Sequence, residues 1–210
     1  MTKIRHVFFD IGGVLATNGW DREQRRIAID KFDLDEAEFQ LRHEEMVGPL
    51  EQGQIGLDEY LDIAVFYEPR SFSREEFRNF VFEQSKPYQD TIDIARAVAE
   101  GCTYWVMTMN NEGEDLNRYR IAAFGLDEVF DAFLSSCWIG LRKPARRFYD
   151  RALGISEARP SESVFIDDRM QNLEPAKQLG MNTIHYQSAP QLADDLRNLG
   201  VKFKLKGNSA

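Results

Sequence analysis

Cysteine and histidine are scarce in this 210-residue chain, which has two cysteines and three histidines. Cys102 and Cys137 lie far apart, and neither belongs to a CxxC pair or to the spacing of a Cys/His metal site. A disulfide scaffold and a structural zinc site are therefore excluded, and two unpaired thiols indicate a reducing compartment. The histidines His6, His43 and His185 lack the spacing of a catalytic triad or a metal site, so we expect packing or surface positions for each.

Long apolar runs are also missing. No stretch approaches the roughly 18 apolar residues of a membrane span. The N-terminal run Val7-Phe8-Phe9 is broken by Asp10, so it does not form the core of a signal peptide. We therefore expect a cytoplasmic protein without a membrane partner.

Positive charge is in deficit, because 26 basic residues face 35 acidic ones and give a net charge of −9. Phosphate-rich surfaces would be repelled, so nucleic acid and anionic membranes are excluded as partners. A small phosphorylated substrate needs only a local positive site and remains compatible. With 43% hydrophobic and 29% charged residues, the chain has a globular composition, suited to one domain with an insertion or to two small domains. We expect a monomer or a weak homodimer.

What the sequence does contain is an alternation of short β-rich runs with helical patterns. The expected strands are Ile4–Phe9, Thr103–Met109, Ala132–Ser135, Ser163–Ile166 and Asn182–Tyr186. The expected helices are Thr91–Glu100, Glu114–Phe124, Arg146–Leu153 and Leu173–Leu179, with Pro144 as the first residue of the third. This order predicts an α/β fold with a parallel sheet covered on both faces.

The interval from residue 18 to residue 88 interrupts this order with helical periodicity alone. Ser73 begins a capping box with Glu76, and Asp58–Phe66 also has helical spacing. An interval of about 70 residues is too long for a crossover connection. We predict a core of residues 1–17 and 89–210 and a small inserted helical domain of residues 18–88. Its own hydrophobic core is expected to contain Phe32, Phe39, Phe66, Phe77, Phe80 and Phe82. Lys204–Ala210 is expected to be a frayed tail.

Acidic residues follow two of the expected strands. Asp10 ends the first and is followed by Gly12 and Gly13, which permit a tight turn. Asp167 and Asp168 end the fourth, and adjacent carboxylates repel one another unless a cation or a shared proton relieves them. Alone, Asp10 fits a residue that caps the turn better than a catalytic one, and Asp167-Asp168 fits a solvated turn. If the two strand ends lie side by side, Asp10 and Asp168 would surround one cation, and Mg²⁺ fits such a site.

Two further polar residues lie close to these strand ends in the expected fold. Asn172, four residues after Asp168, could orient a ligand or a metal-bound water. Lys143 precedes an expected helix, where a cation is unfavourable without an intervening anion, whereas Arg142 fits an ordinary surface charge.

Four motifs in order, Asp10-Ile11-Gly12-Gly13-Val14-Leu15, Asn110-Asn111, Lys143-Pro144 and Asp167-Asp168, resemble those of the haloacid dehalogenase-like (HAD) superfamily of hydrolases. The resemblance spans nearly the whole chain. It implies a Rossmann-like core, and it identifies the helical insert with the C1 cap of that superfamily. The first motif is most similar to that of a subgroup that includes bacterial sugar-phosphate phosphatases.

The resemblance also implies a role for each motif residue. Asp10 corresponds to the nucleophile that forms an aspartyl-phosphate, and Lys143 to the lysine that neutralises it. Mg²⁺ would be held by Asp10, the backbone carbonyl of Gly12 and Asp168, with Asp167 behind them. The phosphate-binding residues implied are Gly12, Gly13, Asn110, Asn111 and Lys143, with Thr108 as an alternative donor if the second motif is shifted.

Gly12 departs from most phosphatases of the superfamily, which have at this position an aspartate that protonates the leaving group. Loss of a general acid typically lowers the reaction rate by 10²–10⁴-fold, and the loss is smallest for substrates with good leaving groups. The function expected is a Mg²⁺-dependent phosphatase acting on a small phosphorylated metabolite. The alternatives are a haloacid dehalogenase-type hydrolase on the same fold, or a catalytically weak phosphate-binding protein. Gly12 and the acidic pair at 167–168 disfavour the dehalogenase.

Overall fold

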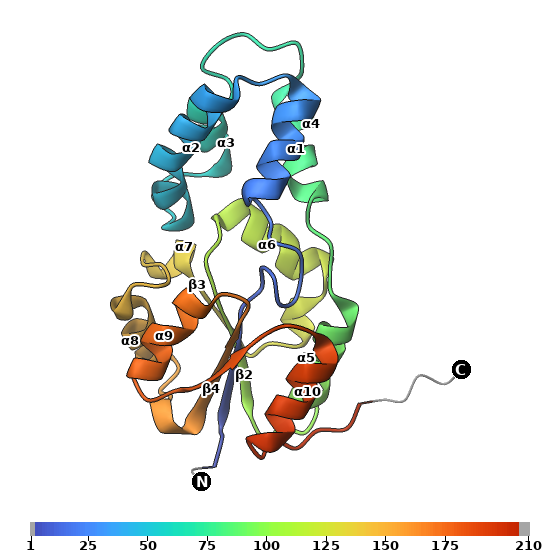
Figure 1. Cartoon of the computed structure of the whole chain (residues 1–210), viewed down its shortest axis with the longest axis vertical. Coiled ribbons are helices and arrows are strands. Elements are labelled where there is room, and N and C mark those ends of the chain that lie inside the picture. Colours follow the sequence, from blue (N-terminus) through green and yellow to red (C-terminus); the bar gives the residue numbers. More distant parts are fainter. Residues whose placement is uncertain (1–2, 206–210) are drawn as a thin grey trace, which may run out of the picture.

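The computed structural model describes residues 3–205 and has an α/β architecture with a helical block at one end of a parallel sheet (Figure 1). The five strands are β1 (His6–Phe9), β2 (Trp105–Asn110), β3 (Ala132–Ser135), β4 (Ser163–Asp167) and β5 (Asn182–His185). They pair in parallel in the order β3-β2-β1-β4-β5. The predicted fold class is confirmed, with strand ends shifted by one or two residues.

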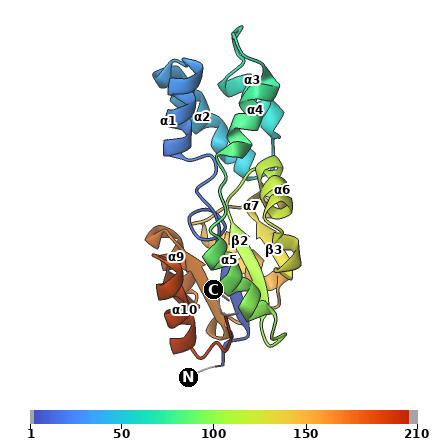
Figure 2. The same ribbon diagram turned by 90° about the vertical axis from the view of Figure 1, so that its right-hand side faces the viewer.

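Helices cover both faces of the sheet (Figure 2). One face packs on α5 (Gln89–Ala99) and α10 (Ala189–Asn198), and the other on α8 (Arg146–Ile155) and α9 (Met170–Gln178). The helices α6 (Glu114–Ala123) and α7 (Ser136–Ile139) follow β2 and β3. Because both faces are covered, β1 and β4 are buried throughout, as their near-continuous apolar sequences require.

The helical block between β1 and α5 consists of α1 (Arg22–Phe32), α2 (Glu36–Glu51), α3 (Leu57–Ala64) and α4 (Arg74–Glu83). We call these four helices the helical insert. They pack around one hydrophobic cluster, which Leu116 of α6 joins from the core. All six phenylalanines expected in this core belong to the cluster or pack against it. The capping box predicted at Ser73 forms in part, since its side chain accepts a hydrogen bond from the Glu76 N–H.

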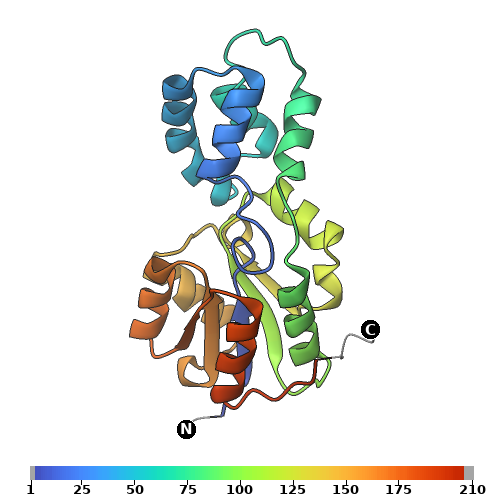
Figure 3. The ribbon, with the colours of Figure 1, turned by 45° about the vertical axis from the view of Figure 1, so that its right-hand side comes forward.

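Two linkers that run side by side connect the helical insert to the sheet (Figure 3). The Thr17 N–H donates to the Lys86 carbonyl at 2.9 Å, and the Tyr88 N–H donates to the Leu15 carbonyl at 2.8 Å. The Thr17 hydroxyl also donates to the Gln84 carbonyl at 2.8 Å. Both passages of the chain are therefore tied to each other where they leave the sheet.

Two local predictions, the first residue of one helix and the tail at residues 204–210, differ from the structure or lie partly outside the described residues. Pro144, expected as the first residue of the helix at Arg146–Leu153, lies before it: α8 starts at Arg146, because the chain first makes a turn in which the Ala145 N–H donates to the Arg142 carbonyl. Residues 206–210 of the expected tail lie outside the described residues, and Lys204 and Leu205 form no regular element. Among the helices within residues 3–205, none has the length and apolar character needed to cross a membrane.

Candidate active site

The first site residue, Asp10, directly follows β1 at the carboxyl edge of the sheet. Its backbone N–H continues the ladder to the Ile166 carbonyl at 2.9 Å, and its Oδ1 accepts from the Ile11 N–H at 2.8 Å. The chain then turns sharply, and Gly13 takes a left-handed conformation with φ of 78°. A side chain at Gly13 would also strike Asp168, since a Cβ there would lie 2.3 Å from Asp168 Oδ2. Glycine is therefore required at position 13 for both reasons.

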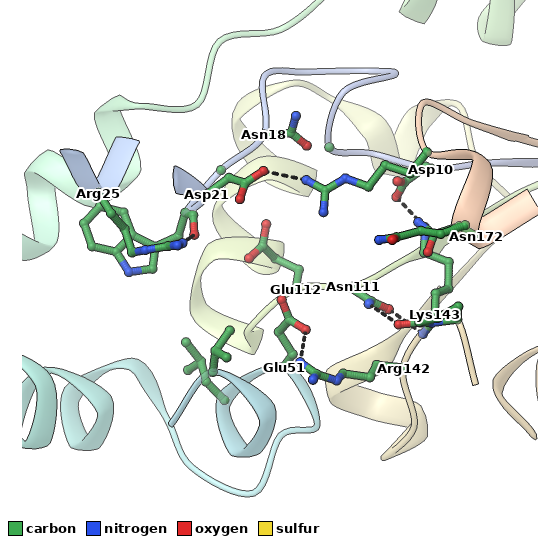
Figure 4. A pocket seen from close by; sticks show the side chains of 18 of the residues that line it. Asp10, Asn18, Asp21, Arg25, Glu51, Asn111, Glu112, Arg142, Lys143 and Asn172 are labelled. Carbon is green, nitrogen blue, oxygen red and sulfur yellow. Dashed lines mark hydrogen bonds and ion pairs between the residues drawn. The ribbon is translucent and has the colours of Figure 1, made fainter. Parts of the chain in front are cut away.

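Lys143 is the cation of the site, and only 1% of its side chain is exposed. Its Nζ lies 3.0 Å from Asp10 Oδ1 (Figure 4) and 2.7 Å from Asp167 Oδ2. Burial alone would lower the pKa of Lys143, but the two carboxylates outweigh it and hold that pKa above its usual value. Asn111 positions the lysine, because its amide donates to the Lys143 carbonyl and accepts from the Lys143 N–H, both at 2.9 Å.

Three carboxylates meet beside this lysine. Asp10, Asp167 and Asp168 offer oxygens that all lie within 4.8 Å of one another. The Asp167 oxygens are occupied by Lys143, by the amide of Asn172 at 3.0 and 3.1 Å, and by the Arg169 N–H. Asp168 differs, because its buried Oδ1 finds no hydrogen-bond partner among the described residues.

This cluster fits a hard divalent cation. Burial, followed by repulsion from Asp167, raises the pKa of Asp168, and burial also raises the pKa of Asp10 well above its usual range despite Lys143. Converging carboxylates that resist ionisation together, one with an unpartnered buried oxygen, are the donors that Mg²⁺ binds.

In the second predicted motif, Asn110-Asn111, the sequence predicts that both amides donate to a phosphoryl group, but the structure places the two side chains differently. The amide of Asn110 donates to Asn117 Oδ1 at 2.9 Å, and its Oδ1 accepts from Ser135 Oγ at 2.8 Å. Thr108 is fully buried on the same face of β2, and its hydroxyl has no partner within residues 3–205. Asn111 lines the cavity beside Asp10, so the structure brings one of the two asparagines to the site.

A cavity of about 340 Å³ lies between the sheet edge and the helical insert. Asp10, Gly12 and Lys143 line it from the core, and Arg25, His43 and Glu51 from the insert (Figure 4). Two ion pairs cross from core to insert at its rim, Arg142 to Glu51 at 2.9 Å and Arg169 to Asp21. The predicted residues Gly13 and Asp168 line a neighbouring cavity on the other side of the turn.

Two residues that the sequence analysis did not identify, Glu112 and Arg120, also line the cavity of about 340 Å³ beside Asp10. Arg120 is almost completely buried in α6 and pairs with Glu112 at 3.1 Å. Glu112 follows Asn111 directly, so its place next to a recognised motif was the available signal. Arg142, for which the sequence predicts an ordinary surface charge, forms an ion pair of 2.9 Å with Glu51 of the helical insert.

Several known proteins are similar to this chain in sequence or in fold. The bifunctional epoxide hydrolase 2 of Sus scrofa is 27% identical over 199 residues, which are 86% of this chain and 36% of that protein. This chain spans only 25–40% of the length of three such mammalian relatives. The D-ribitol-5-phosphate phosphatase of Bacteroides thetaiotaomicron is 24% identical over 213 residues, which are 92% of this chain and 97% of that one.

A solved HAD family enzyme from Bacteroides thetaiotaomicron has the same fold, with a TM-score of 0.75 at 19% identity over 89% of this chain and 95% of that one. A complex of that enzyme with magnesium and inorganic phosphate gives a TM-score of 0.71, also at 19% identity, over 88% and 94% of the two chains. The family model of haloacid dehalogenase-like hydrolases matches residues 4–180, which include the helical insert, Lys143 and all three carboxylates of the cluster. On this match, the chain belongs to the haloacid dehalogenase-like hydrolase family.

Proposed function

We propose that this hydrolase is a Mg²⁺-dependent phosphatase that cleaves a small phosphorylated metabolite through an aspartyl-phosphate formed on Asp10. The observation that carries the proposal is the buried Lys143 ammonium between Asp10 and Asp167. The Ile11 N–H and Lys143 both contact Asp10 Oδ1. Oδ2 is therefore the oxygen that attacks phosphorus, while Lys143 offsets the repulsion between carboxylate and phosphoryl group.

The metal site is proposed from the carboxylate cluster. Asp10, the Gly12 carbonyl and Asp168 would hold Mg²⁺, and Asp167 would orient Lys143 and Asn172 behind it. The unpartnered Oδ1 of Asp168 supports this assignment. When bound, Mg²⁺ supplies positive charge that stabilises the oxygens of the transferring phosphoryl group.

The phosphate group is proposed to lie against Lys143, with the backbone at Gly12 and Gly13 and the Asn110–Asn111 segment around it. Because the Asn110 and Asn111 amides already bond within the protein, we assign this segment chiefly to holding the Lys143 loop in place. Residues 18–88 are proposed as the cap domain that covers the substrate. A cavity of about 340 Å³ with mostly polar residues around it suits a small, hydrophilic metabolite. The D-ribitol-5-phosphate phosphatase relative supports the same class of substrate.

Phosphate release from a panel of phosphorylated metabolites, with and without Mg²⁺, tests this function. Asp10→Asn should lower kcat by on the order of 10⁴-fold, because the amide has the shape of the carboxylate but is not a nucleophile. Asp127→Asn, at an exposed position remote from the cavity, is the matched control. Asp10→Asn turning over at the wild-type rate would rule out the covalent mechanism. Halide release from 2-haloacids without metal would favour a dehalogenase, and phosphate binding without turnover a binding protein.

A further inference from the structure

The proposed reaction needs a proton for the oxygen that leaves phosphorus. An alkoxide is a poor leaving group, and a positioned general acid typically accelerates its departure by 10²–10⁴-fold. Gly12, two residues after Asp10, has no side chain and cannot supply this proton. A protein donor therefore has to come from another residue that lines the cavity.

Besides the nucleophile, three carboxyl groups line the cavity: Asp21, Glu51 and Glu112. Asp21 is unsuited, because the Arg22 N–H and Arg169 hold its pKa below the usual value although burial opposes them. Glu51 belongs to the helical insert and is held at the rim by Arg142, 2.9 Å away. Glu112 comes from the core, one residue after the Asn111 that positions Lys143.

Arg120 connects Glu112 to the empty position at Gly12. A Cβ on Gly12 would lie 3.8 Å from Arg120 Nη1 and 3.1 Å from Asn18 Oδ1. The same Nη1 lies 3.1 Å from Glu112 Oε2. The Arg120 guanidinium is fixed there, since its Nε donates to Ser85 Oγ at 3.0 Å and its Nη2 to the Thr17 carbonyl at 2.7 Å. Glu112 is thus separated from Gly12 by one immobilised guanidinium.

The surroundings of Glu112 allow it to exist in both protonation states near neutral pH. Burial raises the pKa of Glu112 to about 7, and the negative charge of Glu51 acts in the same direction. Arg120 and the Gly113 N–H, which donates to Glu112 Oε1 at 3.3 Å, oppose the rise. An acid whose pKa lies near the working pH is suited to general acid–base catalysis.

We propose that Glu112 is the general acid of this site and that it supplies the proton which a residue at position 12 cannot. This assignment rests on the proposed function. As the bond from Asp10 Oδ2 to phosphorus forms and the bond to the leaving oxygen breaks, that oxygen takes the Glu112 proton and departs as an alcohol. The Glu112 carboxylate, paired with Arg120, then accepts a proton from the water that attacks the phosphoryl-enzyme. Inorganic phosphate and free Asp10 result, and Glu112 returns to its acid form.

Single-turnover kinetics on two probes test this role. The probes are p-nitrophenyl phosphate, whose leaving group needs no proton, and an alkyl phosphate that the wild-type enzyme is first shown to hydrolyse. Glu112→Gln should slow alcohol release from the alkyl phosphate by about 10²–10³-fold and leave the single-turnover rate of p-nitrophenol release nearly unchanged. In the wild type, kcat/KM for the alkyl phosphate should fall as the pH rises above about 7, and the Gln variant should lack this limb. The wild-type profile needs no variant that has to fold.

Two further variants complete the test. Glu114→Gln removes a carboxylate from the exposed side of α6 and should behave as wild type. Equal loss on both probes in Glu112→Gln, or a selective loss in Glu51→Gln instead, would overturn the assignment of Glu112, while single-turnover p-nitrophenol release that depends on Asp10 would keep the proposed function. A wild type that releases no p-nitrophenol or alcohol in an Asp10-dependent way would overturn the proposed function itself.

Discussion

The carboxylates around Lys143 carry more negative charge than one lysine balances. Asp10, Asp167 and Asp168 lie within 4.8 Å of one another, and Lys143 contacts the first two. Burying unbalanced charge is costly, so the isolated cluster resists full ionisation. A divalent cation would relieve this repulsion, and the free Oδ1 of Asp168 shows where the balance is incomplete within residues 3–205.

Replacing each member of the acidic pair should separate metal binding from support of the fold. Asp168→Ala should weaken Mg²⁺ binding and activity together, because it removes the carboxylate with an unpartnered oxygen. Asp167→Ala should affect Mg²⁺ affinity less and lower the free energy of unfolding more, by about 3 kcal/mol, because it leaves the buried Lys143 and Asn172 with fewer partners. Mg²⁺ titrations and urea denaturation of both variants measure this. The reverse ranking in Mg²⁺ affinity would shift the metal ligand to Asp167.

At the same scale, the sequence predicts residues at strand ends better than residues whose role depends on distant partners. Asp10 and Asp168 were identifiable because the carboxyl ends of neighbouring parallel strands meet at one edge. Glu112 was not, because its environment is created by Arg120 from α6 and by Glu51 from the helical insert. Asn110 forms hydrogen bonds with Asn117, in the next helix, and with Ser135, at the end of another strand, and no local sequence pattern predicts such a network.

Among the elements, α6 has a structural role that its polar sequence does not predict. Arg120 reaches from α6 to the Thr17 carbonyl on one linker and to Ser85 Oγ on the other. Since its third contact is Glu112, one side chain joins both linkers of the helical insert to the wall of the cavity. The two linkers and the wall of the cavity at Glu112 are therefore held in one arrangement.

Removing this arginine should destabilise the whole protein. Arg120→Met should lower the free energy of unfolding by about 3 kcal/mol, because it leaves Glu112 and the Thr17 carbonyl buried without their partner. Arg118→Met on the same helix is the control, and it should stay within about 0.5 kcal/mol because its ion pair with Glu114 is exposed. Urea denaturation followed by far-UV circular dichroism measures both. Equal effects would mean that the linkers do not depend on Arg120.

The element boundaries show what local pattern predicts and where tertiary contacts decide. Strand and helix order followed from periodicity, and the aromatic spacing of residues 32–82 predicted the core of the helical insert. The placement of Pro144 as the first residue of α8 was wrong, because the turn from Arg142 to Ala145 precedes the helix, which starts at Arg146. That turn presents Lys143 to Asp10, a contact between residues 133 positions apart that local sequence does not encode.

On the scale of the whole molecule, the net charge is −9, but arginines gather around the cavity. Arg25, Arg120, Arg142 and Arg169 line it together with Lys143. Arg142 and Arg169 also form the ion pairs that cross to the helical insert. The carboxylates of Asp10, Asp21, Glu51 and Glu112 line the cavity as well, so the charges around it nearly balance, although the whole chain carries −9.

Two buried groups should make the free energy of unfolding of the whole molecule depend on pH, and their contributions change in opposite directions as the pH falls. Glu112 has a folded pKa of about 7, above its unfolded value, so its contribution is present at low pH and is lost as the pH rises through 7. His43 has a folded pKa of about 3, because burial lowers it. Its contribution is present above the unfolded value of about 6.5 and is lost as the pH falls.

The surroundings of His43 in the helical insert favour its neutral form. Trp20 Nε1 donates to the Tyr60 hydroxyl at 2.8 Å, and the same hydroxyl forms a hydrogen bond of 2.8 Å with His43 Nδ1, in which it donates when Nδ1 carries no proton. His43→Asn keeps an acceptor oxygen near this position but takes up no proton. Between pH 7 and pH 5 the wild type should therefore lose about 2 kcal/mol of unfolding free energy relative to the variant. Urea denaturation at both pH values measures this difference, to which the other titrating groups contribute equally in the two proteins. Parallel pH dependences would mean that His43 takes up its proton without unfolding the insert.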